Sequence, residues 1–196
     1  MSKEFIKKFK GIKPKTWKLR PEVLLCPNVP KPMHGMAPRV VLGAKWWNDT
    51  RQKAYKTTAF HCVACGIHKS KARGKHWLEG HELYDIDYKK GLMTYLETIP
   101  LCHFCHNYIH DGRMLSLMQK GKFHSGKYKL IIQHGDRVLL NDGLKKLTHK
   151  EREEEFLDMS LNNQVAEWSS WRLVIGKKKY EPKFKTEYQW RQAFSK

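Results

Sequence analysis

The sequence has few acidic residues and no long apolar run. Only 19 Asp and Glu accompany 38 Lys and Arg, so the formal net charge is +19 over 196 residues. Because no stretch of about 18 apolar residues occurs, we expect no membrane-spanning helix. The basic N-terminus also lacks the apolar core of a signal peptide, and a cytoplasmic protein is therefore expected.

The chain does contain enough apolar residues for a folded core. Hydrophobic residues make up 40%, and seven Trp, eight Tyr and eight Phe argue against a disordered chain. A chain with this excess of positive charge repels itself unless it meets a polyanion, and nucleic acid is the commonest one. We therefore expect a folded protein that binds nucleic acid.

Cysteines are scarce as well, and four of the five stand in two Cys-x2-Cys pairs. The pairs are Cys62 with Cys65 and Cys102 with Cys105. In a reducing compartment this spacing predicts metal binding rather than disulfides. Zinc prefers four ligands in a tetrahedron, and two such pairs complete it without an open position. The sequence therefore predicts a structural Zn²⁺ site.

Four segments are expected along the chain. They are a basic arm with an extended, proline-rich segment at 1–43, a zinc-bound module at 44–120, a helical extension at 121–167 and a basic-aromatic tail at 168–196. Apolar periodicity and turn residues predict a β-hairpin from strands 77–84 and 92–99. Helices are expected at 44–58, from near Cys105, at 113–119, at 128–140 and from Thr148 towards Met159, the last with a capping box.

Three histidines accompany the cysteine pairs. His106 follows the second pair directly and His110 lies four residues later, so the two share one face of the expected helix. His81 lies on the first hairpin strand, where Glu79 shares its face and Glu82 points to the other. Two imidazoles at this helical spacing can jointly hold a divalent ion, and His81 could complete the set.

These residues resemble the HNH endonuclease family in its zinc-bound form. The resemblance covers Phe60 to Arg113 and rests on Cys-Val-Ala-Cys-Gly at 62–66, Leu-Glu-Gly-His-Glu at 78–82 and Leu-Cys-His-Phe-Cys-His-Asn-Tyr-Ile-His at 101–110. The stretch from Pro27 to Tyr55 is similar to the N-terminal flank of HNH proteins of phages and bacteria. The resemblance implies an α+β fold, a treble-clef ββα-metal (HNH) module with flanking helices and basic N- and C-terminal extensions.

The resemblance also implies an activity, the metal-dependent hydrolysis of phosphodiester bonds in double-stranded DNA. His106 and His110 would hold a catalytic Mg²⁺ or Mn²⁺, with Glu79 or a water completing the metal shell. His81 would act as the general base that deprotonates the attacking water, while the metal stabilises charge on the phosphate. Such a protein would work in the cytoplasm of a bacterium or of the host of a phage.

The sequence departs from the family at two positions. The first strand carries Gly80, His81 and Glu82 where the family usually has Asp-His or His-His. His81 is therefore either the base, which we prefer, or the metal ligand with Glu82 as the base. In addition, Glu97 stands where the family has its middle Asn. An alternative thus stays open, a catalytically inactive zinc treble clef that binds nucleic acid or interacts with another macromolecule.

A basic loop follows the first cysteine pair. It carries Lys69, Lys71, Arg73 and Lys75. Lysine side chains in particular act as point charges that contact phosphates without reading sequence. We therefore expect this loop to bind nucleic acid in both the nuclease and the binding-module interpretation.

Overall fold

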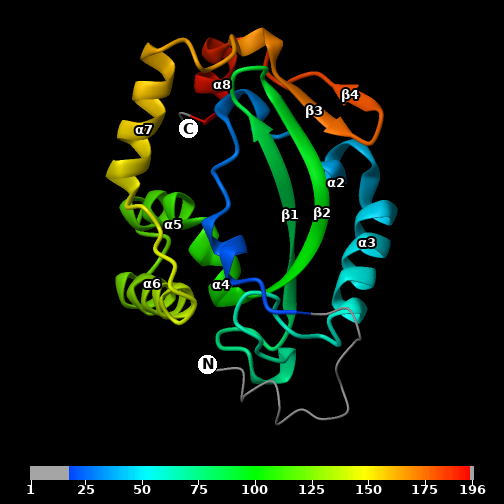
Figure 1. The fold of residues 1–196 in the computed structure, drawn as a ribbon, viewed down its shortest axis with the longest axis vertical. Coiled ribbons are helices and arrows are strands. Elements are labelled where there is room, and N and C mark those ends of the chain that lie inside the picture. The colour runs from blue at the N-terminus through cyan, green and yellow to red at the C-terminus, as the bar shows by residue number, and fades with distance from the viewer. Residues whose placement is uncertain (1–17, 195–196) are drawn as a thin grey trace. The chain divides into compact units, whose positions relative to one another are not determined.

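The computed structural model describes residues 18–194, so most of the expected N-terminal basic arm lies outside the described residues. Within them the fold is mixed α+β, with one four-stranded sheet and seven α-helices (Figure 1). The α+β class expected from the sequence is therefore confirmed. None of the described helices is long and apolar enough to cross a membrane.

The chain divides into two compact units. We call the first the cysteine unit; it comprises 18–26, Thr50–His81 and Thr98–Leu147. The second, which we call the sheet unit, comprises Pro27–Asp49, Glu82–Glu97 and 148–194.

The predicted β-hairpin is present and longer than expected. Strand β1 spans Leu78–Asp87 and β2 spans Leu92–Cys102, so each strand contributes one end to each unit. A connection this short joins antiparallel neighbours. It contains Gly91 with φ +65°, and the Asp87 carboxylate accepts a hydrogen bond from the Lys90 backbone N–H at 2.9 Å. The Lys90–Gly91 turn predicted from the sequence is thus confirmed.

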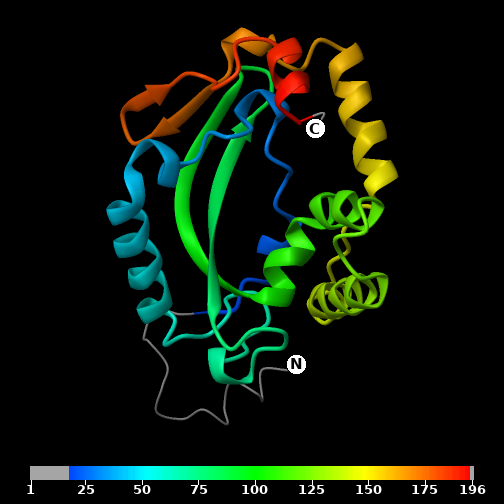
Figure 2. The same cartoon turned by 180° about the vertical axis from the view of Figure 1, so that it is seen from behind.

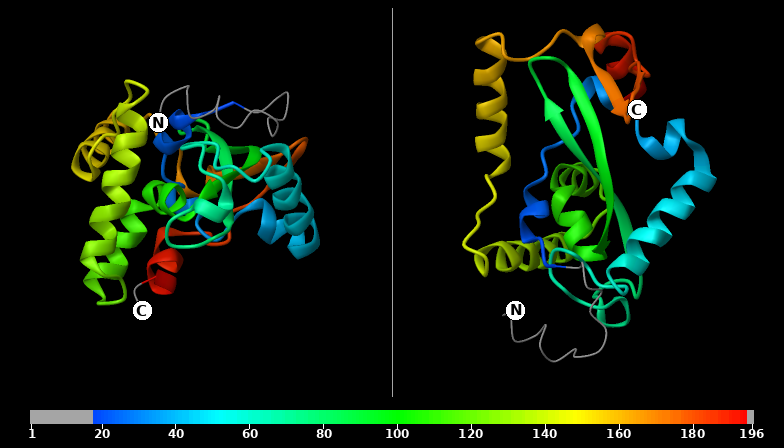
Figure 3. Two further views of the ribbon diagram at one scale, coloured as in Figure 1. Left: turned by 90° about the horizontal axis from the view of Figure 1, so that it is seen from below. Right: turned by 45° about the vertical axis from the view of Figure 1, so that its right-hand side comes forward.

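Three helices follow the hairpin in the cysteine unit. They are α4 (His103–Ile109), α5 (Asp111–Gln119) and α6 (Ser125–Leu140). Figure 3 shows α6 alongside α4, and the 3₁₀ helix η1 (Pro21–Leu25) packs against both. Buried apolar side chains, among them Leu24, Ile131 and Leu139, form the core between these helices. The predicted helices at 113–119 and 128–140 are therefore confirmed within a few residues.

A close approach holds α4 against α6. The Tyr108 ring, which is 1% exposed, lies over Gly135, where an added Cβ atom would come within 2.1 Å of the ring. Beside this contact the Tyr108 hydroxyl donates a hydrogen bond to Asp136 at 2.7 Å. Only a glycine gives the ring this space, so the packing of the two helices depends on residue 135.

The sheet unit contains strands that the sequence did not predict. Strand β3 (Arg172–Ile175) pairs in parallel with β2, with Leu173 opposite Met93, and β4 (Lys178–Tyr180) pairs with β3 in antiparallel fashion (Figure 2). Met33, Met93, Trp171 and Leu173 are buried together. The segment at 168–196, expected only as an appended tail, therefore supplies part of the sheet and of the core.

The remaining elements are mostly short helices. They are η2 (Lys31–Met33), α2 (Pro38–Val41), α3 (Gly43–Thr57), η3 (Lys69–Lys71), α7 (His149–Leu161), η4 (Trp168–Ser170) and α8 (Glu187–Phe194). Thr148 and Glu151 form the predicted capping box of α7. The proline-rich stretch from Pro27 to Pro38, expected to be extended, instead contains η2 and the start of α2. Each of these has a proline in its first turn, where the missing N–H costs nothing.

Candidate metal centres

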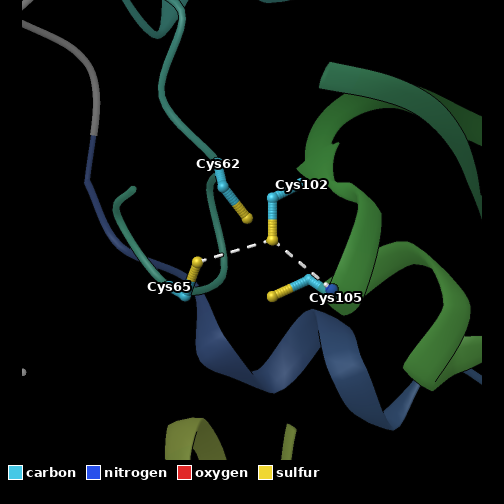
Figure 4. Close-up of side chains that lie close together, drawn as sticks. All are labelled: Cys62, Cys65, Cys102 and Cys105. Atoms are coloured by element: carbon cyan, nitrogen blue, oxygen red, sulfur yellow. Dashed lines mark hydrogen bonds between the residues drawn. The ribbon is translucent and has the colours of Figure 1, made fainter. Parts of the chain in front are cut away.

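The first cysteine pair lies on a tight turn before β1. The Gly66 backbone N–H donates to the Cys62 carbonyl oxygen at 2.9 Å, and the Cys62 N–H donates to the Ile67 carbonyl oxygen at 2.9 Å. Gly66 closes the turn with φ +73°, a conformation that favours glycine. As a result, the side chains of Cys62 and Cys65 converge (Figure 4).

The second pair lies where β2 passes into α4. Cys102 ends the strand and is also the N-cap of the helix, so its Sγ accepts a hydrogen bond from the Cys105 N–H at 3.5 Å. One helical turn brings the Cys105 side chain to the same place, and Figure 4 shows all four sulfur atoms directed towards a shared centre. The two pairs therefore join the turn before the hairpin to the helix after it.

The geometry of the four thiols fits zinc. Their Sγ atoms all lie within 4.8 Å of one another, and all four residues are buried. The Sγ atoms of Cys65 and Cys102 are 3.8 Å apart. A tetrahedron with metal–sulfur bonds of 2.3 Å has edges of about 3.8 Å. The buried four-cysteine cluster predicted from the sequence is thus present and could hold a zinc ion.

Burial and mutual hydrogen bonding shift the pKa values of three of the thiols in different directions. Hydrogen bonding with Cys102 raises the pKa of the Cys65 thiol well above its usual range, and burial does the same for Cys105. Hydrogen bonds from Cys105 and the other two thiols hold the pKa of Cys102 far below its usual range. A bound divalent ion would stabilise all four residues as thiolates, because a coordinating thiol is deprotonated.

One contact at the cluster was not predicted from the sequence. His134, on α6, places its Nε2 atom 3.3 Å from Cys105 Sγ. An imidazole N–H at this distance can donate a hydrogen bond to a metal-bound thiolate. No local pattern could have revealed this residue, because only the packing of α6 against α4 brings it to the cysteines.

The three predicted histidines lie together. His81 on β1, His106 on α4 and His110 at the C-terminal end of α4 each offer a ring nitrogen, and these atoms lie within 4.8 Å of one another. The ring centroids are separated by 4.8–5.5 Å. We call these three residues the histidine group. Such spacing allows three imidazoles to share one metal ion.

Glu79 lies beside the histidine group rather than within it. Its carboxylate accepts a hydrogen bond from His106 Nδ1 at 2.5 Å and another from His103 Nδ1 at 2.8 Å. Although burial opposes it, the hydrogen bonds from these two rings hold the pKa of Glu79 well below its usual range. A carboxylate can only accept, so His106 donates from Nδ1 and presents its Nε2 lone pair for ligation when neutral. Glu79 thus contacts a member of the histidine group through a hydrogen bond; its role as a metal ligand, for which a water was the alternative, stays a prediction.

Glu82 is held by a different partner. Its carboxylate, 7% exposed, accepts hydrogen bonds from Arg39 at 2.5 Å on both oxygens. Because successive strand residues point to opposite faces, its side chain leaves the strand on the side away from His81. Arg39 was not identified from the sequence, since 43 residues separate it from Glu82.

The basic residues of the loop after the first cysteine pair have different neighbours. Lys75 pairs with Glu79 at 3.2 Å, and Lys69 lies over the Phe60 ring at 4.1 Å from its centroid. Lys69 and Lys71 begin and end η3. Lys75 therefore has an anionic partner within the protein, whereas Lys69 stays a cation against an aromatic face.

No protein family, curated protein or solved structure matches the chain. The likeness to HNH endonucleases consequently rests on the motifs themselves and on the two clusters described above.

Proposed function

We propose that the protein is a metal-dependent endonuclease of the HNH type that hydrolyses phosphodiester bonds in DNA. The observation that carries the proposal is the histidine group, in which a strand of the hairpin and the following helix bring His81, His106 and His110 within 4.8 Å. A protein that only bound nucleic acid would have no need of this second cluster beside four cysteines. The order of knuckle, hairpin and helix supports a treble-clef ββα-metal module.

The two clusters have separate roles in this proposal. Zinc on the four cysteines would fix the start of α4, and His106 follows Cys105 directly in the sequence. The histidine group would hold the second ion. Bound there, that ion would supply positive charge that stabilises the phosphate during hydrolysis. Glu79 would orient His106 through the hydrogen bond from its Nδ1 atom.

The position of His81 supports its assignment as a metal ligand. The sequence alone favoured His81 as the general base, but its ring lies 5.1 Å from His110 and 5.5 Å from His106 between centroids. Glu82, the alternative base, is engaged by Arg39. Replacing each residue separately distinguishes these roles, because a missing ligand is partly rescued by more metal whereas a missing base is not.

A group of three imidazoles also bears on the identity of the second ion. Imidazole suits Zn²⁺, Ni²⁺ and Cu²⁺, whereas Mg²⁺ prefers oxygen ligands. We therefore propose that Mn²⁺ or a later transition ion binds the histidine group more tightly than Mg²⁺ does. The net charge of +19 supports a polyanionic substrate.

Cleavage of a supercoiled plasmid tests the proposed function. Purified protein would be incubated without added metal and with Mg²⁺, Mn²⁺, Ni²⁺ or Zn²⁺ in turn. We expect nicking that requires an added ion and is lost in His110→Ala. His149→Ala is the matched control, since it removes an exposed histidine of α7 that pairs with Glu153 at 3.3 Å.

Two outcomes would overturn the proposal. Equal cleavage by wild type and His110→Ala would point to a contaminating nuclease. Tight DNA binding without cleavage under any of the ions would replace the enzyme with the nucleic-acid-binding module.

A further inference from the structure

A tryptophan is exposed just before the strand that carries His81. Trp77 immediately precedes β1 and is 54% exposed. A single exposed apolar residue is ordinary on a protein surface. Here, however, the Nζ atom of Lys75 lies 5.1 Å from the centre of the indole ring, so a cation accompanies the aromatic face.

A short series of contacts connects this tryptophan with the proposed metal site. The same Lys75 Nζ atom lies 3.2 Å from Glu79 Oε1. Glu79 in turn accepts the hydrogen bond from His106, a member of the histidine group. All these residues belong to the cysteine unit. Trp77 is therefore two side chains away from a proposed metal ligand.

A second pair of aromatic and basic side chains lies on the same stretch of chain. Lys69 Nζ is 4.1 Å from the centre of the Phe60 ring, and Lys71 and Arg73 follow within the loop. Aromatic faces interleaved with cations are typical of surfaces that bind single-stranded nucleic acid, where bases stack on rings and phosphates meet positive charge.

We propose that Trp77 is a stacking platform for an unpaired nucleobase of the nucleic acid bound at the histidine group. This inference rests on the proposed function only in taking nucleic acid as the ligand. In a continuous duplex both faces of each base are already covered by neighbouring pairs. An indole reaches a base face only where the strand is unpaired, frayed or flipped out. The site therefore favours single-stranded segments over intact duplex.

Binding assays without added divalent ion test the stacking separately from cleavage. The probe is a fluorescein-labelled oligothymidylate of about 16 nucleotides, the upper end of common single-strand site sizes. Its affinity is followed by anisotropy and compared with that for a blunt duplex. We expect Trp77→Ala to weaken oligothymidylate binding by about 10-fold, as the loss of one stacked base does. Trp77→Phe should retain most of the affinity, and duplex binding should change by less than about 2-fold by the same reasoning.

The control and a direct readout make the result specific. Tyr188→Ala removes another exposed aromatic, 71% exposed on α8, and is expected to leave oligothymidylate binding unchanged. Stacking should quench the fluorescence of Trp77, so the quenching by oligothymidylate should be smaller in Trp77→Phe than in wild type. Circular dichroism and zinc content establish that each variant is folded.

Several results would overturn the inference. One is unchanged single-strand affinity in Trp77→Ala, and another is an equal loss for the duplex, which would indicate a general contact. Competition by unlabelled oligouridylate shows whether the platform accepts RNA as well as DNA. Failure of unlabelled oligothymidylate and oligouridylate alike to compete would contradict base stacking. Because no cleavage is measured, the stacking site can stand when the nuclease proposal fails, and the reverse.

Discussion

At the scale of single residues, the roles of the two glutamates of strand β1 depend on the side chains that their carboxylates contact. Glu79 and Glu82 lie three positions apart on one strand, and the sequence offered both as parts of a catalytic site. Tertiary contacts separate them, because Glu79 accepts from two imidazoles while Glu82 accepts from a guanidinium. Their substitution should therefore have different consequences.

Glu79→Gln is predicted to weaken binding of the second metal ion. The amide keeps the shape but loses the charge, and its single carbonyl oxygen can accept only one of the two hydrogen bonds that His103 and His106 donate to Glu79. Losing the partner of a ligating histidine typically lowers metal affinity 10- to 100-fold. Calorimetric titration with Ni²⁺ measures this, and the zinc content of the cysteine cluster should not change.

Glu82→Gln is the matched control for that measurement. It alters a carboxylate on the same strand but leaves the contacts of the histidine group intact, so Ni²⁺ affinity should stay within about 3-fold of wild type on the same scale. If cleavage instead falls by about 100-fold with unchanged metal affinity, Glu82 is the general base. Equal metal affinity of Glu79→Gln and wild type would contradict the positioning role of Glu79.

At the scale of elements, two contacts between distant segments hold the cysteine unit together. The four cysteines connect the turn before β1 with the start of α4, and the Tyr108 ring seats α4 on Gly135 of α6. At both contacts the side chains are buried and closely packed. A single small substitution, Cys to Ser or Gly to Ala, is therefore expected to disrupt either one.

Removal of zinc is predicted to unfold the cysteine unit. The four thiols are buried, and structural zinc supplies on the order of 10 kcal/mol of apparent folding free energy in small domains. Purified protein should carry close to one zinc, and Cys102→Ser should lose it together with helical signal. Cys26→Ser alters the one cysteine outside the cluster and should keep the metal. A folded, active preparation that contains no zinc would refute the site.

Gly135→Ala is predicted to destabilise the protein strongly. The new Cβ atom would lie 2.1–2.4 Å from three ring carbons of Tyr108, which has no exposed space to move into. Overpacking of this kind typically costs about 1–3 kcal/mol, and occasionally more. Thermal unfolding followed by circular dichroism measures the loss.

Gly126→Ala serves as the comparison within the same helix. Its Cβ atom would meet only the exposed His124 ring, at 3.2 Å, and alanine favours a helix over glycine by up to about 1 kcal/mol. The midpoint temperature of thermal unfolding of Gly126→Ala should therefore equal or exceed that of wild type. Similar midpoints for the two variants would mean that Tyr108 does not lie against residue 135.

At the scale of the whole molecule, the dominant property is charge. The formal net charge of +19 should make DNA affinity fall steeply with salt, since each neutralised phosphate releases condensed counterions. The net charge does not tell which lysine and arginine side chains contact phosphate. Lys75 already has Glu79 as an anionic partner, so it should contribute less than the other basic residues of the loop.

The combined variant Lys69→Ala, Lys71→Ala and Arg73→Ala is predicted to flatten the salt dependence of duplex binding. If each side chain meets one phosphate, the slope of log affinity against log salt should fall by about 3 units. Lys177→Ala, Lys178→Ala and Lys179→Ala remove the same charge from exposed positions in the sheet unit. A larger fall in the salt slope for this control variant would indicate that DNA contacts the β3–β4 hairpin instead.

Local sequence determined those features that depend on neighbours along the chain. The cysteine knuckle, the hairpin turn at Gly91, the helical spacing of His106 and His110 and the capping box at Thr148 each need only a few residues. Steric and hydrogen-bonding preferences over such short distances are nearly independent of context. The sequence therefore placed the four cysteines, His81 and His106 correctly in their local elements, whereas His110 lies one residue beyond α4 as its C-cap.

Tertiary structure decided the features that join distant segments. Four such contacts link residues far apart in sequence. They are the packing of Tyr108 on Gly135, the contact of His134 with Cys105, the pairing of Arg39 with Glu82 and the parallel pairing of β3 with β2. Such contacts depend on how apolar faces pack, and no short pattern encodes them. For the same reason the sequence could name Glu79 as part of the site, whereas only the folded chain set its carboxylate against His103 and His106.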